Sequence, residues 1–258
     1  MELIDVHSHL QDKEFDNDRE DVLENAKKVG VKKIITSTLD LKDAQISMEM
    51  FSKYKGFVYM TVGCNPCIVD EKEMEHSALT LIEQIQSFIR EKKKDIVGIG
   101  EIGLDYYWIE GEQREKQKEF FRLWINFAKE MNLPLIVHSR SAGKYAIEIL
   151  LEEKYSNVLM HSYDGKVGWA LEAAKQGFYF SIPPSIVNST QKQKLVKSID
   201  INRIMLESDA PVLGPEKDKR NEPQNLVFTV KKISEIKSLS EDIVSKITTR
   251  NASEFFKI

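Results

Sequence analysis

Leu3-Ile-Asp-Val-His-Ser-His9 is a short apolar run that ends in two histidines two residues apart. Similar strand-like runs recur along the chain, each followed by a longer amphipathic stretch, and this alternation predicts strands and helices in turn. The predicted strands cover 3–7, 31–37, 57–63, 96–101, 133–138, 158–161, 178–182 and 203–208. The predicted helices cover 18–29, 41–54, 75–91, 112–131, 143–153, 167–175 and 190–198, with two further helical pieces at 224–236 and 241–255.

Eight strand-then-helix units in a row predict an α/β fold with a parallel sheet and right-handed crossovers. Eight strands also close a barrel around packed side chains, and 258 residues suit one such domain. We therefore predict a single-domain (β/α)₈ TIM barrel over residues 1–258, with extra C-terminal helices. The alternative is an open doubly wound sheet, which usually carries a glycine-rich phosphate turn after its first strand. Here His7-Ser-His9 stands in that place.

Composition narrows the class of protein. The net charge is −4, whereas a protein that coats nucleic acid is more often basic, so a nucleic-acid substrate would be held by a few local cations. No apolar run approaches the roughly 20 residues of a membrane helix. Because the predicted chemistry begins at His7, no cleavable leader fits before it, and a cytoplasmic protein is expected.

The two cysteines, Cys64 and Cys67, are too few for a secreted domain held together by disulfides. Their C-x-x-C spacing leaves open a redox pair or half of a zinc site. Two reduced thiols at a strand end are the favoured interpretation.

The histidines gather at one end of the predicted barrel. Of the five in the chain, only His76, near the start of a helix, does not end a predicted strand; the other four are His7, His9, His138 and His161. Residues two apart on an extended chain point to the same face, so His7 and His9 both face the barrel mouth. Asp5 shares that parity, either to orient a histidine ring or as a buried structural carboxylate.

Two acidic residues complete this set, because Glu101 ends the fourth predicted strand and Asp209 follows the eighth. Imidazole combined with carboxylate suits Zn²⁺, Mn²⁺, Fe²⁺ or Mg²⁺. Six protein ligands exceed one tetrahedral site and suit two divalent ions about 3.5–4 Å apart with a bridging carboxylate. The predicted metal ligands are His7, His9, Glu101, His138, His161 and Asp209.

The chain resembles the TatD-related deoxyribonucleases, a branch of the amidohydrolase-like barrels. The matching stretches appear in family order across nearly the whole chain: Asp5-x-His7-x-His9, Gly100-Glu-Ile-Gly-Leu-Asp-Tyr106, Pro134-Leu-Ile-Val-His-Ser-Arg140, His161, Glu207-Ser-Asp-Ala-Pro211, Arg220-Asn-Glu-Pro223 and Asn251-Ala-x-x-Phe255. The resemblance implies metal-dependent hydrolysis of DNA, often from the 3′ end, and the same six ligands. It makes DNA, favoured as a single strand, the expected transient partner, with no membrane and no obligate protein partner.

Two loops depart from the family pattern. Asn65-Pro66-Cys67 replaces a frequent His-Pro-His, and His161-Ser-Tyr-Asp-Gly165 replaces a frequent His-Cys-Phe-Ser-Gly. The predicted ligands survive both changes, whereas the substrate-facing loops differ. The substrate is therefore more open than the type of reaction.

The working hypothesis places His7, His9 and Asp209 on one ion, His138 and His161 on a second, and Glu101 between them. Asp209 is the candidate general base for a metal-activated water. Arg140 is the candidate phosphate clamp, because guanidinium donates two parallel hydrogen bonds; the alternative is an exposed arginine at a helix start. Arg220 is a second candidate cation. Asn65 is a candidate hydrogen-bond donor to substrate, or else a turn residue before Pro66.

Two rival functions remain open at this point. An amidase, lactonase or phosphotriesterase of the same barrel type would use a similar metal mouth, and many of those enzymes bridge their ions with a carboxylated lysine. Glu101 at that place favours the nuclease branch. A non-catalytic binding barrel would be expected to lose a ligand, and none is missing. The sequence leaves four points open: the choice between DNA and RNA, the exonuclease or endonuclease mode, the metal, and the oligomeric state.

Overall fold

The computed structural model describes the backbone of residues 1–70 and 75–258, and the side chains of 1–68 and 78–258. Eight parallel strands pair in sequence order, from β1 to β8. They are β1 (Leu3–Ser8), β2 (Val31–Ser37), β3 (Val58–Val62), β4 (Gly98–Gly103), β5 (Leu135–His138), β6 (Val158–Met160), β7 (Tyr179–Ile182) and β8 (Ile204–Leu206).

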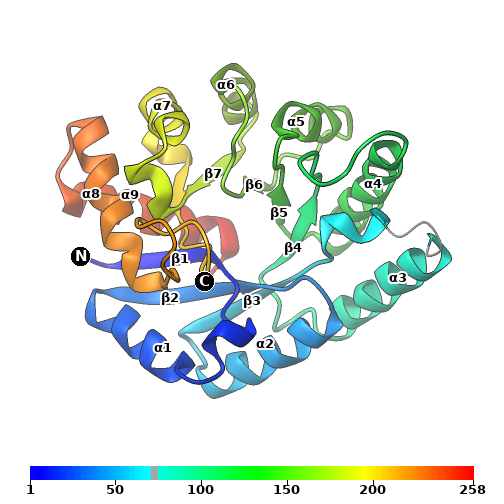
Figure 1. Ribbon diagram of the computed structural model, residues 1–258, viewed down its shortest axis with the longest axis horizontal. Coiled ribbons are helices and arrows are strands. Elements are labelled where there is room, and N and C mark those ends of the chain that lie inside the picture. The colour runs from blue at the N-terminus through cyan, green and yellow to red at the C-terminus, as the bar shows by residue number, and fades with distance from the viewer. Residues whose placement is uncertain (71–74) are drawn as a thin grey trace.

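Helices alternate with these strands and surround them, with α9 behind the strands (Figure 1). They are α1 (Arg19–Lys28), α2 (Leu41–Lys53), α3 (Glu75–Glu91), α4 (Gln113–Met131), α5 (Gly143–Glu152), α6 (Val167–Lys175), α7 (Thr190–Ser198), α8 (Leu226–Lys237) and α9 (Glu241–Phe256). The predicted (β/α)₈ barrel with extra C-terminal helices is thus confirmed. His76 lies on α3, but its side chain falls outside the described residues.

The ring of strands closes where the chain leaves β1 and β8. The backbone N–H of Asp209 donates to the carbonyl of His7 at 2.9 Å, and that of His9 donates to the carbonyl of Ala210 at 2.8 Å. Asp5 strengthens this seam, since its Oδ1 accepts from the backbone N–H of Ser208 at 2.8 Å. The segments that carry the predicted ligands His7, His9 and Asp209 are therefore fixed to one another.

The interior of the barrel is apolar below the mouth. A cluster of buried side chains fills it and ends against Phe255 and Phe256 of α9 at the opposite end; its strand residues are Ile4, Val6, Ile35, Ile136, Leu159 and Met205. A larger apolar cluster packs between the strands and the outer helices. A rigid core of this kind positions residues at the strand ends, where the sites of this fold lie.

The two strands that precede His161 and Asp209 end earlier than the sequence predicts. β6 stops at Met160, so His161 is the first residue after it, and β8 stops at Leu206. His161 and Asp209 therefore lie in the loops just after these strands, at the C-terminal end of the barrel. Among the described residues, no helix is both long enough and apolar enough to cross a membrane.

Candidate metal centre and active site

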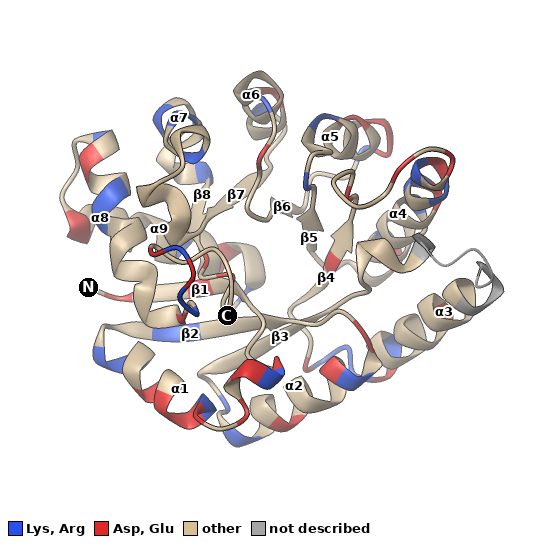
Figure 2. Cartoon of the chain, in the orientation of Figure 1, with Lys and Arg blue, Asp and Glu red and all other residues tan. Residues whose placement is uncertain are grey.

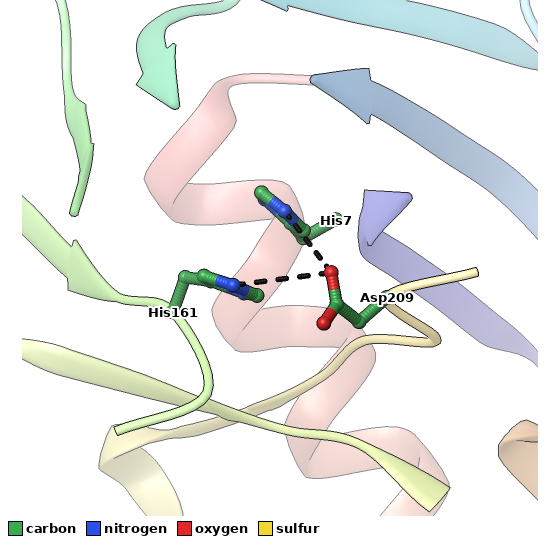
Figure 3. A group of neighbouring side chains, drawn as sticks. All are labelled: His7, His161 and Asp209. Carbon is green, nitrogen blue, oxygen red and sulfur yellow. Dashed lines mark ion pairs between the residues drawn. The ribbon is translucent and has the colours of Figure 1, made fainter. Parts of the chain in front are cut away.

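The six predicted ligands converge at the C-terminal end of the barrel. They come from the ends of β1, β4 and β5 and from the segments after β6 and β8. Figure 3 shows His7, His161 and Asp209 directed toward one another, with Asp209 Oδ1 3.4 Å from His7 Nε2 and 3.8 Å from His161 Nε2. Most of these groups are buried, so their polar atoms face each other rather than bulk water.

One group of donor atoms surrounds a single point. Nε2 of His7 and Nε2 of His9 are 3.2 Å apart. Glu101 Oε2 lies 3.3 Å from each of these nitrogens. Asp209 Oδ1 completes the group, 3.6 Å from His9 Nε2. The three atoms of His7, His9 and Glu101 lie close enough together to share one divalent ion, whose bonds to such atoms are about 2.0–2.2 Å long, and Asp209 Oδ1 borders them.

A second group faces the other oxygen of Glu101. His138 Nδ1 lies 2.6 Å from Glu101 Oε1, and His161 Nε2 lies 3.8 Å from the same oxygen. The two oxygens of Glu101 therefore point to different histidine pairs. This is the placement that a bridging carboxylate requires.

In each imidazole ring, one nitrogen faces the ligand cluster (the inner nitrogen) and the other faces away from it (the outer nitrogen). The hydrogen bond of the outer nitrogen shows which nitrogen carries the hydrogen and leaves a lone pair on the inner one. His9 Nδ1 lies 2.9 Å from the carbonyl of Ser37, which can only accept, so His9 Nδ1 carries the hydrogen. His161 Nδ1 likewise donates to Glu207 Oε2 at 2.7 Å, and His138 Nε2 donates to Asp105 Oδ2 at 2.9 Å. In the neutral ring each inner nitrogen is then an acceptor that faces carboxylate oxygens. Acceptors facing acceptors need a cation between them, so this donor set fits divalent metal ions.

His7 is held by a different contact. Its Nδ1 lies 3.0 Å from Ser37 Oγ, which is also 2.8 Å from Thr61 Oγ1. The ring stacks on that of His161, with centroids 3.8 Å apart and planes 22° apart. Burial and the neighbouring His161 lower the pKa of His7, so its ring is held neutral. Burial also opposes a proton on His161, but Glu207, Asp209 and Glu101 outweigh it and raise the pKa of that ring.

The carboxylates of the cluster stay ionised. Burial alone would raise the pKa of Glu101, but the neighbouring His161 and His138 outweigh it and hold that pKa well below its usual range. For His138, burial opposes the proton, yet Asp105 and Glu101 raise its pKa to about 10. The site thus concentrates negative charge that a cation, either a proton or a metal ion, must offset.

Asp5 has a structural role in this arrangement. Burial raises its pKa to about 8. Its Oδ1 accepts from the backbone N–H groups of His7 and Ser208, and neither contact involves an imidazole ring. Of the two readings of Asp5, the buried structural carboxylate is the one that these contacts support.

The ligands open onto a cavity of about 850 Å³. Both predicted substrate contacts, Arg140 and Asn65, line this cavity, together with Trp108, Lys192 and Asp164. The volume lies in the range of small-molecule and cofactor sites. Figure 2 shows acidic and basic residues interspersed on the outer helices, which agrees with recognition by a few local cations.

Arg140 is an exposed arginine beside the ligands. Its Cζ lies 3.8 Å from the ring centroid of Tyr107 and 5.8 Å from that of Trp108. Within residues 1–68 and 78–258, it forms no ion pair with a carboxylate. A stacked guanidinium keeps its N–H edges available, so Arg140 retains the donors that a phosphate would need.

Arg220 does not fit the role of a second phosphate cation. Its Nη1 and Nη2 donate to Asp18, and Nη2 also donates to Glu222 Oε1 at 2.9 Å. Its guanidinium also lies 4.7 Å from the ring of Phe15. Arg220 therefore connects the loop after β8 to the segment before α1, and its charge is already offset.

Asn65 makes the contact that its predicted turn role requires, and its role toward substrate stays a prediction. Its Oδ1 accepts from the backbone N–H of Cys67 at 2.9 Å, which is a turn contact. This contact occupies the oxygen, so only the amide nitrogen is left as a donor toward the cavity. The neighbouring Cys64 is buried, and burial raises its pKa to about 12. Neither Cys64 nor Cys67 forms a disulfide within the described part of the chain.

Several residues around the site were not singled out from the sequence. Asp105 and Glu207 orient His138 and His161, and Ser181 Oγ donates to Glu207 Oε2 at 2.6 Å. Lys192 is buried in the cavity wall, where its Nζ donates to Ser162 Oγ at 2.8 Å and burial lowers its pKa. Asp105 and Glu207 both lie in stretches that match the family, which is a signal the sequence did offer.

Comparison with known proteins agrees with this geometry. The model of the family described as TatD related DNase matches residues 4–257. The chain belongs to this family.

Among its TatD relatives, the chain is 40% identical over 258 residues to human "Deoxyribonuclease TATDN3", with 98% of this chain and 94% of that protein covered. It is 36% identical over 262 residues to the "Uncharacterized metal-dependent hydrolase YabD" of Bacillus subtilis, with 99% of each covered. The solved structure of YjjV, a TatD homolog from Escherichia coli, superposes with a TM-score of 0.88 at 22% identity, covering 99% of this chain and 98% of that one. The last likeness concerns the fold alone.

These findings confirm the predicted family and the predicted class, a metal-dependent hydrolase of the TatD type. The His, Glu and Asp cluster is able to hold metal.

Proposed function

We propose that this TatD protein hydrolyses phosphodiester bonds of DNA at a site that binds two divalent ions. The proposal depends on one observation: the two carboxylate oxygens of Glu101 face different histidines. Its Oε2 lies 3.3 Å from the Nε2 atoms of His7 and His9, whereas its Oε1 lies 2.6 Å from His138 Nδ1. Two ions bridged by one carboxylate are a recurrent arrangement in phosphatases and nucleases.

The ligands divide into two sets in this proposal. His7, His9 and Asp209 would hold one ion, His138 and His161 the other, and Glu101 both. Zn²⁺, Mn²⁺ and Mg²⁺ are the candidates, and the predominance of imidazole favours Zn²⁺ over Mg²⁺. When bound, such ions lower the pKa of water and offset charge on phosphoryl oxygens.

Asp209 is the proposed general base. Its Oδ1 lies 3.4 Å from His7 Nε2 and 3.8 Å from His161 Nε2, so it is next to one histidine of each proposed ligand set. Burial would raise its pKa, but His161 and His9 outweigh that effect and lower it, so the group is ionised and can accept a proton. In the reaction the proton of the attacking water passes to an Asp209 oxygen.

Arg140 and Asn65 are proposed to hold the substrate. Arg140 donates its N–H edges to two phosphoryl oxygens, and the Asn65 amide nitrogen donates one further hydrogen bond. Both residues line the same cavity as Glu101 and Asp209. A phosphate in this cavity can therefore contact Arg140 and the general base Asp209 at the same time. DNA is favoured as substrate because the human relative is named a deoxyribonuclease and the chain is 40% identical to it.

The test is a screen with the purified protein and added Zn²⁺, Mn²⁺ or Mg²⁺. Single-stranded DNA, duplex DNA and RNA are set beside simple amides, lactones and phosphotriesters. We expect DNA to be cleaved and the small substrates to be turned over weakly. Efficient turnover of an amide, lactone or phosphotriester, with no cleavage of any DNA, would replace the nuclease by another hydrolase.

A further inference from the structure

Two aromatic side chains at the mouth of the barrel are more exposed than such residues usually are. Trp108 is 62% exposed and Tyr107 is 55% exposed, on the loop between β4 and α4. Trp108 also lines the cavity that holds Glu101 and Asp209. Large exposed apolar rings that border a site are typical of ligand contacts rather than of an ordinary surface.

The loop that carries these rings is held in place. Asp105 Oδ1 accepts from the backbone N–H groups of Tyr107 at 3.0 Å and Trp108 at 3.1 Å. The side chain of Arg114 donates to the carbonyl of Ile109 at 2.8 Å. The other oxygen of Asp105 accepts from His138, so one carboxylate positions both a proposed metal ligand and the aromatic loop.

The two rings do not have the same neighbours. The guanidinium of Arg140 stacks on one face of the Tyr107 ring, with its Cζ 3.8 Å from the ring centroid. The ring of Trp108 stands at 90° to that of Tyr107, with centroids 4.9 Å apart, and Arg140 is farther from it, at 5.8 Å. Tyr107 therefore positions the proposed phosphate clamp, whereas Trp108 borders the cavity next to it.

We propose that Trp108 is a base-stacking residue of the active site, which orders an unpaired nucleobase beside the phosphate held by Arg140. The proposal rests on the phosphodiesterase function above and adds to it a contact between Trp108 and a nucleobase of a single-stranded substrate. Every base presents an aromatic face, so stacking on tryptophan tolerates any sequence. In a duplex that face is covered by neighbouring base pairs, and only unstacked bases reach the ring.

The test compares two oligonucleotides of one sequence, of which one lacks the base beside the phosphodiester bond that is cut. Wild type, W108A, W108F and a control, F228A, are assayed for kcat/KM on both. Phe228 is a matched control because it is 44% exposed on α8 and does not line the cavity. Metal content and thermal unfolding are measured for each variant, and fluorescence anisotropy reports the binding of both oligonucleotides to metal-stripped protein.

Wild type should prefer the intact oligonucleotide by about tenfold to a hundredfold in kcat/KM. That preference should disappear in W108A, persist in part in W108F, and persist fully in F228A, with the anisotropy affinities following the same order. If wild type cuts DNA and W108A keeps the full preference, the stacking role is wrong and the nuclease function stands. If wild type cuts neither oligonucleotide with any metal, the function falls and the stacking role falls with it.

Discussion

Asp105 and His138 are joined by a hydrogen bond of 2.9 Å, in which His138 Nε2 donates to Asp105 Oδ2. The bond fixes the tautomer of His138, so that Nδ1 is the nitrogen that faces Glu101 Oε1 at 2.6 Å. The same carboxylate accepts from the loop of Tyr107 and Trp108 through its other oxygen. The proposed metal centre and the substrate mouth thus share one supporting residue.

Asp105→Asn should weaken metal binding at the His138 site. The amide has one acceptor oxygen where the carboxylate has two, and it carries no charge to support an imidazole donor. Loss of such an outer contact typically costs about 10–100-fold in metal affinity or activity. Metal titration by calorimetry measures the effect. Asp164→Asn is the control, because the hydrogen bonds that Asp164 accepts from residues 1–68 and 78–258 come from the backbone N–H of Ser141. Equal affinities in the two variants would contradict the role of Asp105.

Arg140→Ala should lower kcat/KM on single-stranded DNA by about tenfold to a hundredfold, because a hydrogen bond to a charged group is worth roughly 1.5–3 kcal/mol. Arg140→Lys should recover only part of this loss, since an ammonium cannot form the two-pronged contact. Metal content should not change. The activity of wild type should fall as salt rises, and the fall should be shallower in Arg140→Ala.

Arg220→Ala should affect stability rather than substrate binding, in contrast to Arg140→Ala. The guanidinium is already paired with Asp18 and Glu222, so its removal should lower the unfolding temperature and leave the salt dependence of kcat/KM unchanged. Thermal unfolding and the same kinetic assay measure both effects. A loss of salt dependence in Arg220→Ala would show that Arg220, not Arg140, meets the phosphate.

Cys64 should resist alkylation at pH 8. Burial raises the pKa of Cys64 from 9.0 to about 12, so the folded protein holds on the order of a thousandfold less reactive thiolate at that pH. Cys67 is only partly buried and lines the cavity, so iodoacetamide should modify it first. The Cys64 thiol ionises near pH 9 in the unfolded chain but stays protonated in the folded protein. The contribution of Cys64 to the free energy of unfolding therefore declines as pH rises above 9. Mass spectrometry of the two peptides decides, and modification of Cys64 at the faster rate would contradict its burial.

The sequence predicts the barrel because strand and helix periods alternate eight times, and it predicts the convergence of histidines because parallel strands share one C-terminal edge. It does not predict contacts that depend on the direction of side chains from distant segments. Asp105 meets His138 across 33 residues, and Arg220 meets Asp18 across 202 residues. Arg220 looked available for phosphate because the local sequence around it does not include that carboxylate.

The metal content of wild type and of Glu101→Ala tests whether the carboxylate of Glu101 bridges two ions. Both proteins are incubated with excess Zn²⁺ or Mn²⁺, desalted, and analysed for metal per chain. Wild type should bind about two ions per chain. Glu101→Ala should bind one or none and should lose DNA cleavage by about a hundredfold or more. Two ions retained in Glu101→Ala with near-normal turnover, or no metal bound by wild type, would contradict a bridging role for Glu101.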